Sequence, residues 1–448
     1  MKNRTIPNAS NIPIIGSTLK IIGKDPRDFL LKQHHKLGPI FRLKVMHLNY
    51  VVIAGEKANQ FAGKEGINVL ESKTFWKNML HELEADNFLI GLDGPEHLML
   101  RKIFRKNFLK TNVDSHLQTI NNLCIKIFDD IKVGESFEVV ERILQLTSQM
   151  IGCVMTGEIP KREDLEYFLF YINSITNHFA LNRLPACLLK FKGFRFKKAK
   201  TLTFNFAESV IEKHLTGSSN LNNFVDAVID TAKNKCPHLF NHGDVRFSAI
   251  LPLFAGIDTL GQTINYALFE LHKNPIILAN LREEINSVWS KKIPSSSELK
   301  KMKILNSVIL ETLRLHPAAF GMVRTATQDF EFEGSLVKKN EDVVVLTTAT
   351  HFMENYFKNP SIFDIERYCS PRNEHRQRNA FVPFGIGPHF CLGAGLAENL
   401  MGLALGSILY NYEFEKLNPN LKIKERVNPT PSLENRFKLK ILHKRKHN

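Results

Sequence analysis

Residues 384–393 of the chain read FGIGPHFCLG, and this stretch decides the fold. It places three glycines and one proline around Cys391, directly before an apolar segment that is typical of a helix. Glycine permits positive φ and lets the backbone come close to a flat ligand. Backbone N–H groups at the start of a helix stabilise an anionic sulfur and lower its pKa. The residues therefore predict either a thiolate at Cys391 or a glycine-rich turn around a buried core cysteine.

The same stretch resembles the cysteine loop of the cytochrome P450 family. The likeness consists of Phe384, two glycines two positions apart, a basic residue, and a Cys-x-Gly sequence that ends at Gly393. His389 stands where many members have arginine. The resemblance implies that Cys391 is the axial ligand of a haem iron, that Phe384 packs near the sulfur, and that the cofactor is haem b (iron protoporphyrin IX). Thiolate ligation in this family favours cleavage of the O–O bond of dioxygen.

A second motif lies upstream of the cysteine loop. Glu311 and Arg314 are three positions apart, so they share a helical face and can form an ion pair. Taken alone, such a pair is most often an exposed surface pair. At this place in the chain it resembles the family's Glu-x-x-Arg helix, and residues 363–368 resemble the segment that follows it. The resemblance implies that Arg367 completes a buried network with Glu311 and Arg314 that fixes the backbone beneath the haem.

A third motif places Asp258 and Thr259 inside an apolar segment, residues 245–273, which is expected to form a long helix. From the residues alone, Thr259 bonds back to a carbonyl of the preceding turn and bends the helix. The resemblance implies a different role, in which Ala255 and Gly256 make room for dioxygen. Asp258 and Thr259 then organise water for proton delivery, a general-acid role.

Four cationic or imidazole side chains match the family's contacts with the haem carboxylates. His97 and Arg101 are four positions apart and share one helical face. Arg324 and His389 complete the set. Pairing of cations with partly buried carboxylates is physically favourable, whereas each of the four, taken singly, is also compatible with an ordinary surface charge.

The resemblance also assigns a mostly apolar set of residues to a substrate pocket, although each of them alone is compatible with core packing. These residues are Phe75, Trp76, Phe88, Phe254, Ala255, Ala319, Phe320, Met322 and Leu433. An apolar pocket implies a lipophilic substrate such as a fatty acid, a terpenoid or a steroid-like molecule.

The remaining pattern predicts a mainly α chain with a small β portion. Helices are expected over residues 27–36, from near Pro95, over 300–316 and over 392–410; a hairpin over 41–45 and 50–54; short strands at 330–332 and 343–346 around one turn; and a loop at 290–298. The resemblance covers about residues 27–440 and implies the cytochrome P450 fold, with haem between the long central helix and the helix of the cysteine loop. We expect one domain over residues 1–448, with an irregular approach at 1–26 and a basic, solvated tail at 441–448.

Composition bounds the partners. The chain has 448 residues, 43% of them hydrophobic, and a formal net charge of +15, which favours an acidic partner or surface or reflects only a lysine-rich solvated surface. Cations expected on the helix of Arg101 suggest docking of an acidic ferredoxin or flavodoxin, itself served by a separate reductase: Lys102, Arg105, Lys106 and Lys110. Six scattered cysteines indicate a reducing compartment. No run approaches the roughly 20 apolar residues that span a bilayer, so we expect a cytoplasmic monomer without a transmembrane anchor.

Aromatic and cationic residues alternate over residues 190–198. Such a pattern is compatible with binding of single-stranded nucleic acid or with contact to a membrane surface. By its place in the family's chain it resembles the lid between two helices at the substrate entrance. We therefore expect a lid, leave weak peripheral membrane contact open, and expect no nucleic acid.

These features predict a haem-thiolate monooxygenase that hydroxylates or epoxidises a lipophilic substrate with dioxygen. A first alternative keeps the fold but is a peroxygenase or an isomerase of hydroperoxides. A second is a non-catalytic haem or lipid carrier. Neither alternative needs the Asp258–Thr259 pair, so its presence favours the monooxygenase.

Overall fold

The computed structural model describes residues 4–10, 12, 16–21, 26–180, 193–217, 223–417, 425–427, 430–433 and 437–445. The helices in these ranges are α1 (Thr18–Ile21), α2 (Pro26–Leu37), α3 (Glu56–Gly63), α4 (Lys73–Glu82), α5 (Gly94–Phe104), α6 (Leu117–Lys126), α7 (Val139–Ile151), α8 (Arg162–Ile175), α9 (Gly193–Leu215), α10 (Phe224–Asp230), α11 (His242–Lys273), α12 (Pro275–Trp289), α13 (Ser296–Leu299), α14 (Lys303–Leu315) and α15 (Ala394–Asn411). The strands are β1 (Ile40–Val45), β2 (Leu48–Ala54), β3 (Leu70–Glu71), β4 (Ser136–Glu138), β5 (Met322–Ala326), β6 (Phe330–Phe332), β7 (Ser335–Val337), β8 (Asp342–Leu346), β9 (Tyr412–Lys416), β10 (Glu425–Val427), β11 (Pro431–Leu433) and β12 (Lys438–Lys444). The mainly α character with a small β portion is as expected.

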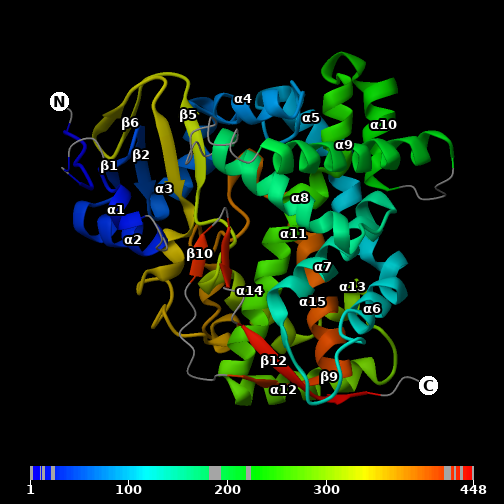
Figure 1. Ribbon diagram of the computed structural model, residues 1–448. Helices are drawn as coiled ribbons and strands as arrows, with labels where there is room; N and C mark the ends of the chain where they lie inside the picture. Colours follow the sequence, from blue (N-terminus) through cyan, green and yellow to red (C-terminus); the bar gives the residue numbers. More distant parts are fainter. Residues whose placement is uncertain are drawn as a thin grey trace.

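The largest sheet lies to one side of the molecule with α1, α2 and α3, and the long helix α11 runs through the middle (Figure 1). The strand order of this largest sheet is β1-β2-β8-β5-β3. The predicted hairpin of β1 and β2 is confirmed, with Ile40 opposite Ile53. β8 continues the sheet parallel to β2. The inner strands are rich in β-branched residues that suit a buried pleated surface, and Val52 and Ile53 are fully buried.

The expectation that residues 330–332 and 343–346 surround one turn is wrong. β6 pairs with β7, whereas β8 pairs with β2 and β5. The hairpin of β6 and β7 closes through Glu333 and Gly334, both of which have positive φ. A two-residue turn of this kind matches the twist of the two strands that it joins.

Several helix boundaries also differ from the sequence prediction. The loop expected at 290–298 ends early, because Ser295 and Glu298 form a capping box that starts α13 at Ser296. Helix α5 stops at Phe104. Arg105 and Lys106 therefore lie in a following 3-10 turn, η2 (Arg105–Phe108), and Lys110 lies in another, η3 (Lys110–His116).

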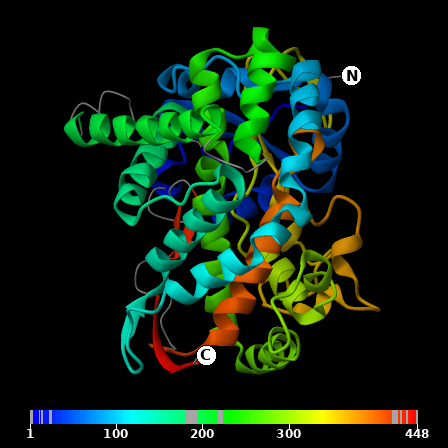
Figure 2. The same cartoon turned by 90° about the vertical axis from the view of Figure 1, so that its right-hand side faces the viewer.

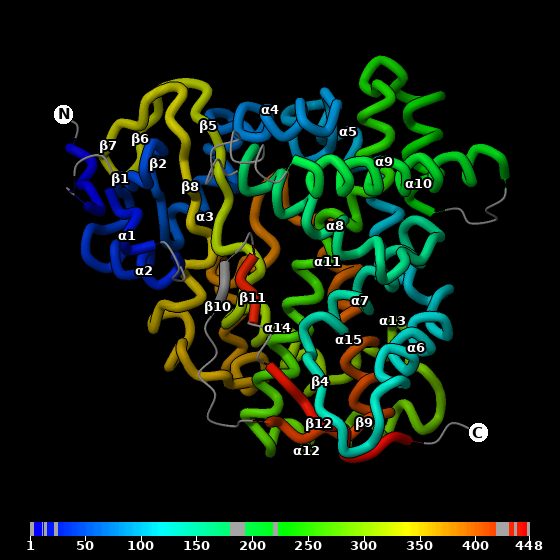
Figure 3. Tube along the Cα trace, viewed as in Figure 1, coloured from blue at the N-terminus to red at the C-terminus, as the bar shows by residue number. Residues whose placement is uncertain are grey.

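The C-terminal segment is not a solvated tail over all of residues 441–448. Strand β12 pairs with β4 on one side and β9 on the other (Figure 3). Ile441 is fully buried in this sheet, and the ammonium of Lys444 donates to the carbonyls of Phe128 and Asp129 at 3.0 Å. The N-terminal approach is likewise partly attached to the large sheet, through bridges from Asn8 to Arg42 and from Gly16 to Val45.

Helices α11 and α15 form the centre of the helical part. In Figure 2, α15 runs between the cyan helices of the N-terminal half and the yellow-green helices α12 to α14. Two helical segments, His242–Lys273 and Gly387–Asn411, have the length and apolar composition of a membrane span, but 72% of the most apolar window is buried within the protein in each case. Both therefore belong to the core of the fold.

Candidate functional site

The cysteine loop is shaped by its glycines. Gly385 and Gly387 both have a φ of +76°, which only glycine adopts without strain. A Cβ on Gly387 would lie 3.0 Å from the carbonyl oxygen of Ala62, so this glycine also lets the loop approach α3 closely. The amide of Cys391 donates to the carbonyl of Phe384 at 2.9 Å, which closes the loop just before α15 begins.

Cys391 is exposed, and two groups favour an anionic sulfur there, but desolvation by the surrounding protein opposes them. Desolvation raises the pKa of the Cys391 thiol, while the hydrogen bond from the Gly393 backbone and the positive charge of Arg101 lower it. The balance leaves the pKa above its ordinary value, so the helix start alone does not make a thiolate. Coordination to a metal ion deprotonates a thiol outright. The sulfur is thus suited to be a metal ligand whose charge appears on binding.

The structure brings the four predicted carboxylate contacts together. His97 lies on α5, and its ring stacks on that of His389 with centroids 4.0 Å apart. The charges of Arg101 and Arg324 both act on His97. Asp93, which the sequence analysis did not single out, accepts a 2.9 Å hydrogen bond from His389 and two more from the amides of Ser72 and Lys73.

This cluster has more hydrogen-bond donors than the described residues satisfy. Nε2 of His97 is buried without a partner in the described part of the chain, and burial lowers the pKa of His97 to about 3. Burial also lowers the pKa of Arg324 to about 10. Its guanidinium donates to the carbonyl of Val323 at 2.7 Å, and the negative charge of Asp93 partly offsets the effect of burial on it. Arg101 donates to the carbonyl of Phe390 at 2.6 Å.

On α11, Ala255 is exposed although Leu253 and Ile257 beside it are buried. The hydroxyl of Thr259 donates to the carbonyl of Ala255 at 2.7 Å, which is the bond within the helix that the residues alone suggest. A Cβ on Gly256 would lie 2.6 Å from Cδ1 of Ile151. Gly256 therefore serves close packing of α11 on α7, a role that the sequence analysis did not foresee.

Asp258 is the one titratable side chain of this motif. Its Oδ1 accepts a 3.4 Å hydrogen bond from Gln262, and its Oδ2 is buried without a partner among the described residues. Burial raises the pKa of Asp258 to about 6. A carboxyl group of this kind exchanges its proton close to neutral pH, as a proton-transfer group must.

Beneath the cysteine loop lies a fully buried ionic network. Glu311 accepts from Arg314 at 2.8 and 2.9 Å and from Arg367 at 3.2 Å, and none of the three side chains is exposed. The hydroxyl of Tyr368 adds a 2.9 Å bond to Glu311, and Glu374 accepts from Arg367 at 2.9 Å. Tyr368 and Glu374 were not predicted, because single polar residues in an irregular segment carry no sequence signal for burial.

The expected pocket residues fall into two groups. Phe88 and Leu433 lie in packed core, at 1% and 3% exposure, and the ring of Phe88 meets Phe247 edge to face. The other seven keep open surface: Ala255 and Ala319 are exposed, and Phe75, Trp76, Phe254, Phe320 and Met322 are half-buried. In this structure the Phe88 ring thus contributes to the core rather than to an open surface.

Of the segment 190–198, residues 190–192 lie outside the described ranges, and the rest begins α9. Its cations hold α9 against α8: Arg195 pairs with Glu166 at 2.6 Å and lies over the ring of Phe170. Phe194 points outward and is 84% exposed. The aromatic and cationic alternation therefore serves helix packing over residues 195–198, and one large apolar side chain is left at the surface.

The residues present fit haem. A cysteine sulfur at the end of the glycine loop, an exposed alanine on the central helix, and two arginines beside an unpartnered histidine nitrogen correspond to the needs of an iron atom, its open face and two carboxylates. The orphaned Nε2 of His97 is the most specific of these observations, because buried polar atoms are almost always paired.

Comparison with known proteins gives the same direction. A family model described as "Cytochrome P450" matches residues 6–440. "Cytochrome P450 3A31" of Mesocricetus auratus is 34% identical over 455 residues, with 92% of this chain and 86% of that protein covered. "Putative cytochrome P450 120" of Synechocystis sp. is 25% identical over 441 residues, with 97% and 96% covered. "Abscisic acid 8'-hydroxylase CYP707A1" of Solanum lycopersicum is 24% identical over 399 residues, with 88% and 82% covered.

A solved structure titled "Retinoic acid bound cyanobacterial CYP120A1" has the same fold. It superposes with a TM-score of 0.85 at 23% identity, and the match covers 99% of this chain and 100% of that one.

Proposed function

The chain belongs to the cytochrome P450 family, and on that premise we propose that it is a haem-thiolate monooxygenase that hydroxylates or epoxidises a lipophilic substrate. The observation that carries the proposal is the placement of Cys391 on a glycine-shaped loop at the start of α15, near the charge of Arg101 and the cluster in which Nε2 of His97 has no described partner. Haem, when bound, supplies an iron atom that binds and activates dioxygen.

In this proposal Cys391 holds the iron, and the four side chains His97, Arg101, Arg324 and His389 hold the carboxylates of haem b. Asp93 orients His389 through its 2.9 Å bond. Arg101 has a second role, because its charge favours the anionic form of Cys391. The Glu311–Arg314–Arg367 network keeps the backbone below the loop in place, since breaking a buried ion pair leaves an uncompensated charge.

Proton delivery is assigned to Asp258 and Thr259. The raised pKa of Asp258, about 6, means that its carboxyl group takes up and releases a proton closer to neutral pH than an ordinary aspartate does. The hydroxyl of Thr259 donates to Ala255, so its oxygen lone pairs accept a hydrogen bond from water. In this proposal Asp258 exchanges its proton with water, and the oxygen of Thr259 holds a water molecule in place by accepting a hydrogen bond from it.

The substrate is proposed to be lipophilic, such as a fatty acid, a terpenoid or a steroid-like molecule, because the open pocket positions are apolar. Two relatives carry names that point to small lipophilic acids: one is named an abscisic acid hydroxylase and the other was solved with retinoic acid bound. We also propose that residues 1–448 form one domain.

Electrons are proposed to come from an acidic ferredoxin or flavodoxin with its own reductase. The surface beside the cysteine loop combines exposed cations with exposed apolar side chains: Lys102, Arg105, Lys106, Lys110, Leu98, Met99 and Leu109. An acidic partner is attracted to such a surface and docks faster.

The role of Thr259 can be tested with two threonines of α11 that make the same kind of bond. Thr263 donates to the carbonyl of Thr259 at 2.8 Å, just as Thr259 donates to Ala255. The first step is a screen of dodecanoic acid, farnesol and a steroid, in which binding is detected as a shift of the Soret band. With the binder and a surrogate ferredoxin system, Thr259→Ala should lower product per electron consumed about tenfold or more and release peroxide, because positioned proton transfer contributes 10²–10⁴-fold.

The matched Thr263→Ala variant should keep the product yield of the parent. The monooxygenase proposal is wrong if turnover needs no electron donor, runs on peroxide alone and survives Thr259→Ala. That outcome would favour the peroxygenase. A protein that binds the probes but forms no product in either system would instead be a carrier.

A further inference from the structure

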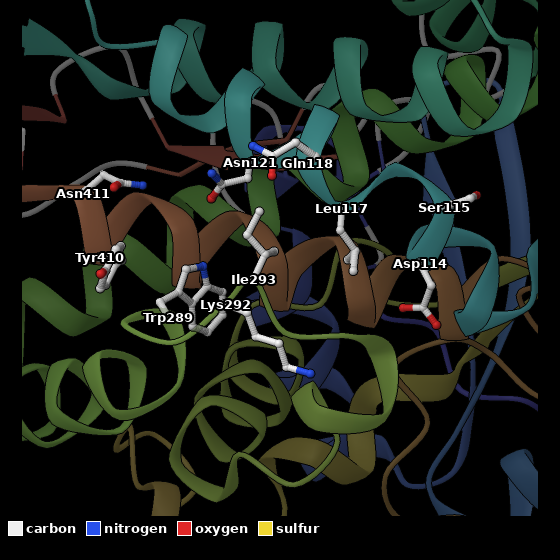
Figure 4. A pocket seen from close by; sticks show the side chains of 10 residues that line it. All are labelled: Asp114, Ser115, Leu117, Gln118, Asn121, Trp289, Lys292, Ile293, Tyr410 and Asn411. Atoms are coloured by element: carbon white, nitrogen blue, oxygen red, sulfur yellow. The ribbon is translucent and has the colours of Figure 1, made fainter. Parts of the chain in front are cut away.

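A pocket of about 620 Å³ lies between η3, α6, the end of α12 and the end of α15. Figure 4 shows the pocket along the ribbon of α15. Side chains from η3 and α6 line it, together with Trp289 at the end of α12 and Lys292 and Ile293 just after that helix. Pockets of 300–1,000 Å³ are the usual size for small-molecule sites. Cys391 precedes the other end of α15, which has 18 residues, so about 27 Å of helix separates the two sites.

Trp289 is held rigidly in this pocket by a glycine. A Cβ on Gly406 would lie 2.0 Å from the indole ring, so the ring packs directly on the backbone of α15. Trp289 is only 5% exposed, and its Nε1 has no hydrogen-bond partner among the described residues. The tryptophan therefore presents a fixed donor that the protein itself leaves unused.

Two unused acceptors line the same pocket. Asn411 donates to Ser407 through its Nδ2 at 2.7 Å, and its Oδ1 is buried without a described partner. Oδ1 of Asn121 is also buried and unpartnered within the described ranges. Figure 4 shows Asn121 and Trp289 on opposite sides of the pocket, with Ile293 between them. Three orphaned groups from three elements around one pocket need an explanation.

The charged groups at the rim are already engaged. Asp114 accepts from the amide of Ser296 at 2.7 Å, and Lys292 pairs with Glu298 at 2.9 Å. The buried lining atoms without a partner among the described residues are thus one neutral donor and two neutral acceptors, next to the apolar side chains of Leu117 and Ile293 and the polar side chains of Ser115, Gln118 and Tyr410.

We propose that this pocket is a second binding site, separate from the haem site, for an uncharged and partly apolar molecule whose polar end both accepts and donates hydrogen bonds. An amide or an alcohol has this chemistry: its oxygen accepts from Nε1 of Trp289, and its N–H or O–H donates to Oδ1 of Asn121, with Oδ1 of Asn411 left for the second N–H of an amide. The proposal does not depend on the substrate or the reaction of the haem site.

The chain's two tryptophans make the test direct. In the haem-loaded Trp76→Phe variant, labelled with ¹⁵N-tryptophan, the single indole N–H signal belongs to Trp289. Benzamide and 2-phenylethanol are the neutral probes, for the amide and the alcohol, and benzoate and 2-phenylethylammonium are their charged counterparts. At millimolar concentrations at least one neutral probe should shift this signal saturably, and the charged counterparts should not.

Asn121→Leu, introduced in the same background, should weaken that binding about tenfold, the effect of losing one hydrogen bond of roughly 1.4 kcal/mol. Asn280→Leu is the matched control, because Asn280 is exposed on α12 and does not line the pocket. It should bind like the parent. The proposal is overturned if neither neutral probe shifts the signal, if benzoate shifts it as strongly, or if Asn121→Leu binds as the parent does while its haem spectrum shows that it is folded.

Discussion

At the scale of single residues, each proposed site contains a buried polar atom that has no hydrogen-bond partner among the described residues. Oδ2 of Asp258, Nε2 of His97 and Nε1 of Trp289 are all buried without a described partner. Other buried polar atoms of the described residues, such as Nε1 of Trp76 and Oδ1 of Asn59, also lack a partner, whereas Glu311 accepts five hydrogen bonds from its neighbours. A native fold retains an unpaired buried group where a ligand, water or proton transfer uses it.

The raised pKa of Asp258 predicts a pH-dependent difference in stability. The carboxyl group ionises near pH 4 in the unfolded chain but near 6 in the folded one, so the folded state loses stability as the pH rises from about 4 through 6. Asparagine does not ionise. The free energy of unfolding of Asp258→Asn should therefore rise relative to the parent by up to about 3 kcal/mol between pH 4 and pH 7.

Urea unfolding at both pH values measures this difference. Asp28→Asn, on the exposed face of α2, controls for the loss of a surface carboxylate. An Asp258→Asn variant whose stability relative to the parent is the same at pH 4 and pH 7 would contradict the assignment of a raised pKa.

The sequence predicted which residues lie near one another better than it predicted their individual contacts. Spacing and resemblance singled out His97, Arg101, Arg324 and His389, and the structure places them in one cluster. Asp93 and Tyr368 escaped notice, because an isolated polar residue in an irregular segment does not announce its partner. The packing of Gly256 on Ile151 escaped as well, since a contact between distant helices leaves no local pattern.

At the scale of elements, α15 connects the two proposed sites. Its first turn follows Cys391, and its last turns carry the glycine on which Trp289 packs. The apolar sequence of residues 392–410 predicted this helix to within two residues of its ends, because a long buried helix has a long apolar sequence. Short elements were predicted less well: α13 depends on one capping box, and β7 depends on a two-residue turn.

Two glycines of α15 allow the packing of Trp289 to be tested. Alanine normally stabilises a helix interior by about 1 kcal/mol relative to glycine. At Gly402 a Cβ would meet Leu299 and Leu305 at 3.5–3.7 Å, an ordinary contact, whereas at Gly406 it would meet the Trp289 ring at 2.0 Å. Gly402→Ala should therefore be neutral or stabilising, and Gly406→Ala should lower the free energy of unfolding by about 1–3 kcal/mol.

Thermal unfolding followed by circular dichroism separates the two variants. Equal midpoints for Gly402→Ala and Gly406→Ala would show that the indole ring does not lie against the backbone of α15 as the structure has it.

At the scale of the whole molecule, the cations that give the net charge of +15 have at least two different uses. Lys102, Arg105 and Lys106 are exposed, and Lys110 pairs with Glu398 of α15, although these cations continue past the end of α5 and do not share one helix as the sequence suggested. The basic C-terminus, in contrast, is partly used in folding, through Lys444 and its bonds to Phe128 and Asp129. A composition total does not distinguish these two uses of cations.

Charge reversal tests the docking surface. Lys106→Glu should slow reduction by a plant-type [2Fe–2S] ferredoxin several-fold at low salt, because the acidic partner is steered by attraction that salt screens. The difference from the parent should vanish near 1 M salt. The Lys32→Glu variant, changed on the exposed face of α2 beside the large sheet, should be reduced by the ferredoxin at the rate of the parent. Equal rates for both variants at low salt would place the docking surface elsewhere.

The central claim is that the sulfur of Cys391 binds a haem iron, and one absorption spectrum tests it. The purified protein, reduced under carbon monoxide, should show the red-shifted Soret band of a thiolate-ligated haem. Cys391→Ser should lose that band or the haem itself, and Cys369→Ser, which changes another free cysteine, should keep it. A protein without bound pigment, or a Cys391→Ser variant with an unaltered spectrum, would contradict the account.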